Sequence, residues 1–211
     1  MSPKHSVPVS QLPTAAEAKR ALSREFHRDV RILVGIVAVL WGVLLVDAAL
    51  LSVQLTRFGI LPRTAIGLRG LLFAPFLHSG VGHLIGNTIG FLLLGCLVLF
   101  REETDFWTVS GVGALAGGMG LWLFGRPAIH VGASGIIFCY FGYLISTGYF
   151  ERRIGSILLS LGAVGLWGGF IFGILPGQPG VSWEGHLFGL LSGVLAAWLL
   201  ARFGRRRRGA A

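Results

Sequence analysis

Six long apolar segments constrain the fold of this 211-residue chain more than any other feature. They span roughly residues 31–53, 79–100, 106–124, 132–150, 154–175 and 182–203. A helix needs about 20 apolar residues to cross ~30 Å of hydrocarbon, so each segment is long enough to span a bilayer. Lipid admits only helices or closed barrels, and runs this continuous, without strict alternation, favour helices. The sequence therefore predicts an all-α, polytopic membrane protein with a bundle of six transmembrane helices.

The composition excludes the common soluble and disordered classes of protein. Apolar residues make up 54% of the chain and charged residues 13%, whereas a soluble domain carries about 25% charged residues. So few charges cannot cover a water-facing surface, and so many apolar residues are not typical of a disordered chain. Glycine accounts for 33 residues, many of them inside the apolar segments. Because small residues let membrane helices approach closely, we expect a tightly packed bundle.

The basic residues indicate the orientation of the chain. Fourteen of the 18 Lys and Arg residues would lie on the side of the membrane that holds both chain ends, so the positive-inside rule places both termini in the cytoplasm. We expect a cytoplasmic tail over residues 1–30, with a short helix over Thr14–Arg31, a membrane domain over 31–203, and an Arg-rich cytoplasmic tail over 204–211. The charges flank apolar segments, which indicates contact with anionic lipid and not with nucleic acid. We expect a multi-pass protein of a bacterial inner membrane.

Polar residues near the starts of three apolar segments are the candidates for chemistry. The second segment carries His83 and Asn87, the fourth carries Ser134, and the sixth carries His186. These even-numbered segments all run inward from the outer side, and a helix rises 1.5 Å per residue, so the four side chains would lie about 5 to 12 Å below the outer start. Polar groups are costly inside apolar spans and are functional candidates for that reason.

A nucleophile and a base can be assigned within this set. Serine is a weak nucleophile unless a neighbouring base takes its proton, and His186 could serve Ser134 if the fourth and sixth helices touch. Glycines recur every four residues along the sixth segment and would permit that contact: Gly185, Gly189 and Gly193. No acidic residue is placed to orient His186, so the sequence predicts a Ser–His dyad.

His83 and Asn87 are spaced i, i+4 and therefore project from one face of a helix. Two donors aimed at the serine would form an oxyanion hole. Taken singly, each residue also has a structural explanation. An intramembrane Ser usually bonds a backbone carbonyl one turn back, and His and Asn can join helices. Their convergence at one depth favours the chemical interpretation.

The chain resembles a known family at these residues. HLIGN (His83 to Asn87), GASG (Gly132 to Gly135) and GHLFGLLSG (Gly185 to Gly193) occur in the order and in the helices found in the rhomboid intramembrane serine proteases. The similarity extends over all six segments, roughly residues 31–203. GxSG alone would be weak, but its combination with the two flanking motifs is highly specific.

The resemblance implies a six-helix core with a Ser–His dyad in a water-filled cavity open to the outer face. It implies Ser134 as nucleophile, His186 as general base, and His83 and Asn87 as oxyanion donors. It also implies that the enzyme cleaves transmembrane segments of other membrane proteins within the lipid bilayer, without a metal or cofactor. The sequence leaves the oligomeric state open.

Three further positions acquire supporting or substrate-binding roles from the resemblance. Gly132 corresponds to the glycine that lines the oxyanion site. Phe138 stands where the family often has a tyrosine under the histidine, and its ring can still stack on His186. Arg69 matches the arginine of a Trp-Arg pair, with Leu68 in place of the tryptophan. The fifth segment and the loop over 176–182 resemble the family's mobile gate and cap.

Two other classes of function compete with this interpretation. An intramembrane metal hydrolase could use His78, His83 and His186, although the chain lacks an HExxH motif. A catalytically inert scaffold that binds membrane proteins, or a small transporter, is the non-enzymatic alternative. Inactive relatives in the resembled family typically lose the serine or the histidine, and both are present here.

Overall fold

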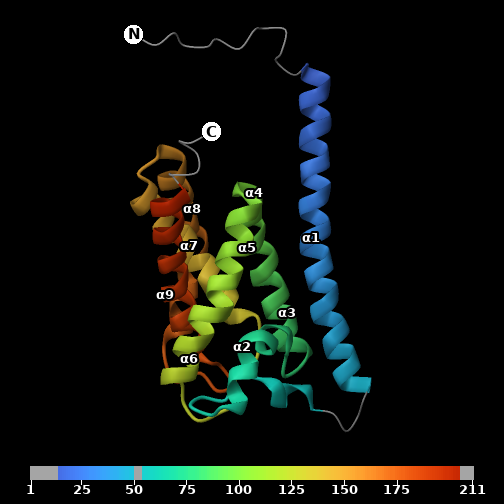
Figure 1. Ribbon diagram of the computed structural model, residues 1–211, viewed down its shortest axis with the longest axis vertical. Coiled ribbons are helices and arrows are strands. Elements are labelled where there is room, and N and C mark those ends of the chain that lie inside the picture. Colours follow the sequence, from blue (N-terminus) through green and yellow to red (C-terminus); the bar gives the residue numbers. More distant parts are fainter. Residues whose placement is uncertain (1–13, 50–53, 205–211) are drawn as a thin grey trace.

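The computed structural model describes residues 14–49 and 54–204, and this part of the chain is almost entirely helical (Figure 1). Its α-helices are α1 (Ala15–Ala49), α2 (Gly70–Phe73), α3 (Val81–Gly90), α4 (Cys96–Arg101), α5 (Glu103–Val112), α6 (Gly118–Phe124), α7 (Ser134–Glu151), α8 (Ile154–Trp167) and α9 (Trp183–Leu199). Three π-helical turns continue or connect them, namely η5 (Phe91–Gly95), η6 (Gly113–Gly117) and η8 (Leu200–Gly204). Four 3-10 turns complete the described structure: η2 (Leu55–Phe58), η3 (Ile66–Arg69), η4 (Ala74–Phe76) and η7 (Gly168–Ile174).

Five helical segments within the described residues are long and apolar enough to cross a membrane: Ala15–Ala49, Val81–Arg101, Glu103–Phe124, Ile154–Ile174 and Trp183–Phe203. The remaining predicted segment corresponds to α7, which has 18 residues and a lower mean hydropathy than these five segments. This helix packs against α3, α5, α8 and α9, and most of its side chains are buried in protein. A helix enclosed by its neighbours need not be as apolar as one that faces lipid. The predicted all-α membrane bundle is confirmed.

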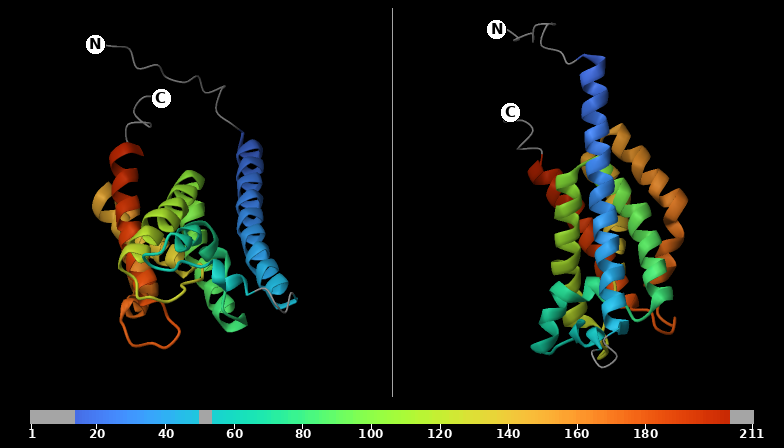
Figure 2. Two further views of the ribbon diagram at one scale, coloured as in Figure 1. Left: turned by 60° about the horizontal axis from the view of Figure 1, so that its bottom comes forward. Right: turned by 90° about the vertical axis from the view of Figure 1, so that its right-hand side faces the viewer.

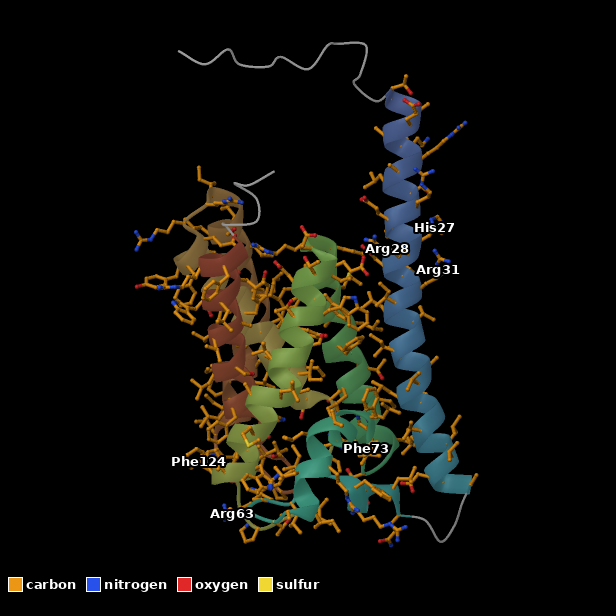
Figure 3. All side chains as sticks on the ribbon, viewed as in Figure 1. His27, Arg28, Arg31, Arg63, Phe73 and Phe124 are labelled. Atoms are coloured by element: carbon orange, nitrogen blue, oxygen red, sulfur yellow. The ribbon has the colours of Figure 1, made fainter. Side chains whose placement is uncertain are left out.

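Helix α1 differs from the prediction of a short helix followed by a separate span. It is one continuous helix, because neither Gly nor Pro interrupts the sequence between Ala15 and Val34. It lies at the edge of the bundle and extends beyond it (Figures 1 and 2). Figure 3 shows Arg28 on the side of α1 that faces the bundle, where it forms an ion pair of 3.1 Å with Glu103. The parts of the predicted tails over residues 1–13 and 205–211 lie outside the described residues.

The backbones of α7 and α9 are in direct contact at glycines. A Cβ atom on Gly189 would overlap the carbonyl oxygen of Gly135, and one on Gly193 would overlap the carbonyl oxygen of Cys139. A Cβ atom on Gly142 of α7 would likewise overlap the Leu190 carbonyl oxygen. The close approach predicted from the glycine stripe is therefore confirmed. It fixes the starts of α7 and α9, and hence Ser134 and His186, at one end of the bundle.

A polar network ties the helices together at the opposite end. Arg101 of α4 forms an ion pair with Glu151 of α7 and lies 3.5 Å from Asp105 of α5. The Tyr143 hydroxyl donates a 2.6 Å hydrogen bond to Asp105. Such largely buried ion pairs add little net stability, but loss of one partner would leave the other charge uncompensated.

The long loop before α3 is ordered and lies at the end of the bundle where α7 and α9 begin (Figure 1). Ile60 and His130 form an isolated antiparallel bridge with two hydrogen bonds of 2.9 Å, which ties this loop to the segment before α7. Arg69 donates a 2.9 Å hydrogen bond to the Arg57 carbonyl, and its guanidinium lies 4.4 Å from the centre of the Phe58 ring. These contacts of Arg69 thus stabilise the loop itself.

Candidate active site

A cavity of about 550 Å³ lies at the end of the bundle where α7 and α9 begin. His83 and Asn87 of α3, Ser134 of α7 and His186 of α9 all line it. The structure thus brings together the four polar residues that the sequence placed at one depth. Phe138 also lines the cavity, and Arg69 does not.

Ser134 is the first residue of α7 and is half-buried at the cavity. Gly132, two residues earlier, has a φ of +118°, a backbone conformation that side-chain-bearing residues rarely adopt. Its amide donates a 2.9 Å hydrogen bond to the Ala74 carbonyl, which anchors the turn to the long first loop. The turn presents Ser134 at a helix N-terminus, where backbone N–H groups lack intrahelical partners and the helix dipole favours negative charge.

The ring of His186 is oriented by two neighbours that are not acidic. Its Nδ1 atom lies 2.8 Å from the carbonyl oxygen of Gly173, at the end of the fifth helical segment. A carbonyl can only accept, so Nδ1 carries the proton of the neutral ring and Nε2 is left with a lone pair. The Phe138 ring stacks on the imidazole, with centroids 4.1 Å apart and an interplanar angle of 8°. His186 is therefore held in the tautomer that a general base requires.

We expect Gly173→Ala to lower kcat by up to about 10²-fold, because small displacements of a catalytic group are costly. A Cβ atom at Gly173 would lie 2.6 Å from Cζ of Phe138 and 3.3 Å from Nδ1 of His186, so it would displace the ring or the carbonyl. Gly169→Ala is the matched control, since nothing lies within 4 Å of a Cβ there. Steady-state cleavage assays of both variants provide the measurement, and equal kcat values would contradict the orienting role of Gly173.

His83 and Asn87 both approach the turn before Ser134. A Cβ atom on Gly132 would lie 2.8 Å from Nε2 of His83 and 3.7 Å from Nδ2 of Asn87. The Ser79 amide and hydroxyl lie 3.5 and 3.1 Å from Nδ1 of His83, so Nδ1 accepts and Nε2 carries the proton of the neutral ring. Asn87 donates one amide hydrogen to the His83 carbonyl at 2.9 Å and retains a second. Both side chains can thus offer an N–H group beside Gly132.

Asn87→Ala should lower kcat by about 10²- to 10³-fold with little change in KM, the typical cost of removing one oxyanion donor. Thr88→Ala, on the same helix, is a suitable control because its hydroxyl bonds the Leu84 carbonyl and the Trp41 indole. Michaelis–Menten analysis distinguishes a loss of kcat from a rise in KM. A rise in KM alone would assign Asn87 to substrate binding in place of transition-state stabilisation.

His78 precedes α3 and is buried beside His83, with ring centroids 5.2 Å apart. Burial, and secondarily the His83 ring, lowers the pKa of His78 from 6.5 to about 4. The alternative metal site would need His78, His83 and His186 together. Among the residues that the structure describes, no group of three or more His, Cys, Asp or Glu side chains is arranged to hold a metal ion.

The pKa of His78 predicts a loss of stability in mild acid. The His78 side chain takes up a proton near pH 6.5 in the unfolded state but only near pH 4 in the folded state. The contribution of neutral His78 to the free energy of unfolding is therefore complete above pH 6.5 and decreases as the pH falls from 6.5 to about 4. His78→Phe should therefore show a smaller drop in Tm between pH 7 and pH 5 than the unmodified protein. Thermal unfolding at both pH values measures this, and an equal drop in both proteins would contradict the assignment.

Five polar residues at or beside the cavity were missed by the sequence analysis: Ser79, Arg126, His130 and Ser182, which line it, and Glu184, which is bonded to Arg126. His130 is buried, and burial lowers its pKa. For His130 and Ser182 the available signal was a polar residue four positions before each member of the predicted dyad, in HVGAS and SWEGH. The pairing itself joins residues 52 positions apart and is not visible in the sequence.

Comparisons with known proteins place this arrangement in context. The Rhomboid domain family matches residues 67–203. An uncharacterized protein of Mycobacterium tuberculosis is 39% identical over 181 residues, which cover 82% of this chain and 75% of the relative. A Bacillus subtilis protein, YdcA, whose name places it among the rhomboid proteases, is 30% identical over 145 residues, 65% of this chain and 69% of its own length. Rhomboid-like protein 11 of Arabidopsis thaliana, chloroplastic, is 32% identical over 150 residues, 62% of this chain and 51% of its own length.

Proposed function

Because this chain belongs to the rhomboid family, we propose that it is a serine endopeptidase that cleaves transmembrane segments of other membrane proteins. One observation carries the proposal: Ser134, His186, His83 and Asn87 line a single cavity of about 550 Å³ at one end of a membrane bundle. The printed name of the Bacillus subtilis relative agrees with this class of reaction.

The proposed reaction follows the chemistry of an activated serine. Nε2 of His186 accepts the hydroxyl proton as the oxygen of Ser134 attacks a substrate carbonyl carbon. Negative charge then develops on the substrate oxygen, where N–H donors from His83, Asn87 and the start of α7 would stabilise it. The intermediate collapses to an acyl-enzyme while His186 returns the proton to the leaving amine. Water then hydrolyses the ester by the same sequence of proton transfers.

Access for a substrate segment is proposed on the side of α8 and η7. Most residues of the Ile154–Ile174 segment are exposed at the surface of the bundle, and Phe170 of this segment lines the cavity. The carbonyls of a substrate helix are occupied by hydrogen bonds, so the substrate must unwind locally before attack. Helix-destabilising Gly or Pro residues near the cleavage site would lower that cost.

The orientation in the membrane is part of the proposal. The start of α1 and the end of α9 lie at the end of the bundle opposite the cavity (Figure 1). Arg101 is the last residue of α4, Arg152 follows the end of α7, and Arg153 precedes the start of α8, so all three lie at that same end. The positive-inside rule favours a cytoplasmic location for that end, with the cavity facing outward. A bacterial inner membrane remains our proposed location.

The test is cleavage of a single-pass substrate by the purified protein in liposomes, with the cut site mapped by mass spectrometry. We expect one cut within or beside the transmembrane segment, at an unchanged rate when a metal chelator is present. A protein that co-purifies with the substrate and never cuts it would support the inert scaffold instead. Cleavage that a chelator abolishes would support the metal hydrolase.

A further inference from the structure

Two residues that hydrogen-bond each other stand four positions before the two members of the proposed dyad. Nδ1 of His130 lies 2.7 Å from the hydroxyl oxygen of Ser182. His130 precedes Ser134, and Ser182 precedes His186. Ser182 is also the N-cap of α9, since its oxygen accepts from the Gly185 amide at 3.3 Å. The hydrogen bond between His130 and Ser182 therefore joins the segment that leads into α7 directly to the N-cap residue of α9.

The remaining contacts of His130 fix its protonation and its place. Its Nε2 lies 3.1 Å from the Arg126 carbonyl, which can only accept, so Nε2 carries the proton and Nδ1 accepts from the Ser182 hydroxyl. Its backbone amide and carbonyl are both bonded to Ile60 at 2.9 Å. With 5% of its surface exposed and both ring nitrogens engaged, His130 is not a free base that could take part in proton transfer.

A second tie runs in parallel between the same two segments. The Arg126 amide donates to Glu184 at 3.2 Å, and the Arg126 guanidinium lies 3.5 Å from the other carboxylate oxygen. The guanidinium also donates to the Val181 carbonyl at 2.6 Å. Glu184 is 4% exposed, so this carboxylate is held in place by its partners. Arg126, His130, Ser182 and Glu184 together form what we call the clasp.

The clasp adds a polar tie next to the glycine contacts between the two helices. Gly189 of α9 presses against Gly135, the residue after Ser134, and Gly193 presses against Cys139 further along α7, whereas the clasp joins the loop segments that lead into both helices. The starts of the two helices, which carry Ser134 and His186, are joined across the loops by the clasp. We propose that His130 is a positioning residue that, through Ser182, sets the separation between the oxygen of Ser134 and Nε2 of His186. This inference rests on the proposed proteolytic function.

The test compares His130→Ala with His130→Asn and with His27→Ala, the same substitution at an exposed histidine on α1. We expect His130→Ala to lower kcat by about 10- to 100-fold with KM nearly unchanged, because the dyad and not the substrate contact is displaced. Asn can accept from the Ser182 hydroxyl in place of Nδ1, so His130→Asn should recover most of the loss. His27→Ala should have the kcat of the unmodified protein.

A double-mutant cycle with Ser182→Ala gives a second, independent readout. If His130 acts through Ser182, the double variant should be no slower than the slower single variant. Multiplied losses, or a His130→Ala protein with unchanged kcat, would overturn the positioning role while leaving the proteolytic function intact. If the unmodified protein neither cleaves substrate nor reacts with a phosphonate probe, the proposed function itself fails. If the His130→Ala protein does not fold, the His130→Asn and Ser182→Ala proteins are compared instead. We expect the higher kcat for His130→Asn, and equal kcat values would contradict the inference.

Discussion

Ser134→Ala should reduce cleavage of a transmembrane substrate by at least about 10⁴-fold, to the level of the uncatalysed background. The proposed reaction forms its covalent bond at this oxygen, whereas the other two serine hydroxyls at the cavity are bonded to histidines, Ser79 to His83 and Ser182 to His130. Ser134 is half-buried at the start of α7, where alanine is accepted in a helix, so expression and Tm should remain close to those of the unmodified protein. Time courses of product formation in detergent micelles, over several days, provide the necessary range.

Ser146→Ala is the matched control for this substitution. It lies on the same helix, and its hydroxyl bonds the Gly142 carbonyl one turn back, the ordinary role of an intramembrane serine. We expect its cleavage rate to remain within a few-fold of that of the unmodified protein. Cleavage by Ser134→Ala at more than about one tenth of the normal rate would remove Ser134 from the mechanism.

Gly189→Val should destabilise the bundle and abolish cleavage together. Any Cβ atom at Gly189 overlaps the carbonyl of Gly135, which is backbone and cannot rotate away, so α7 and α9 must separate beside Ser134. Overpacking of this kind costs about 3 kcal/mol or more, which corresponds to a Tm lower by roughly 10 °C in a chain of this size. Thermal unfolding in detergent measures the stability, and the cleavage assay measures the consequence for the dyad.

Gly162→Val is the control, since nothing lies within 4 Å of a Cβ atom at that position of α8. The Gly162→Val substitution adds the same side-chain volume as Gly189→Val, but into open space. Its Tm should stay within a few degrees of that of the unmodified protein. Equal Tm values for the Gly189→Val and Gly162→Val proteins would show that the contact between α7 and α9 does not hold the bundle together.

The helical bundle could be predicted because its cause is local in the sequence. Runs of about 20 apolar residues are read directly, and the bounds of the second and fifth segments, expected over 79–100 and 154–175, agree closely with the helices Val81–Arg101 and Ile154–Ile174. The continuity of α1 was missed, since a change from polar to apolar composition does not interrupt a helix. Burial of α7 inside the bundle depends on its neighbours and left only a weak trace in its composition.

The cavity residues could be predicted because alternate apolar segments run in the same direction through the bundle. Three such segments carry polar groups at a similar distance from their starts. Ser134, His83 and His186 followed from that convergence. The contact between the Gly173 carbonyl and His186 could not be predicted, because a backbone oxygen in a 3-10 turn leaves no side-chain signal in the sequence. The bond between His130 and Ser182 also depends on the folded loops, which bring together segments far apart along the chain.

The central claim is that His186 activates Ser134 as a nucleophile, and covalent labelling by a fluorophosphonate tests it most directly. The purified protein in micelles is treated with the probe, digested, and mapped by mass spectrometry. We expect a single adduct on Ser134 in the unmodified protein and a labelling rate at least about 10²-fold lower in His186→Ala. An adduct at another residue, or equal labelling of Ser134 with and without His186, would contradict the account.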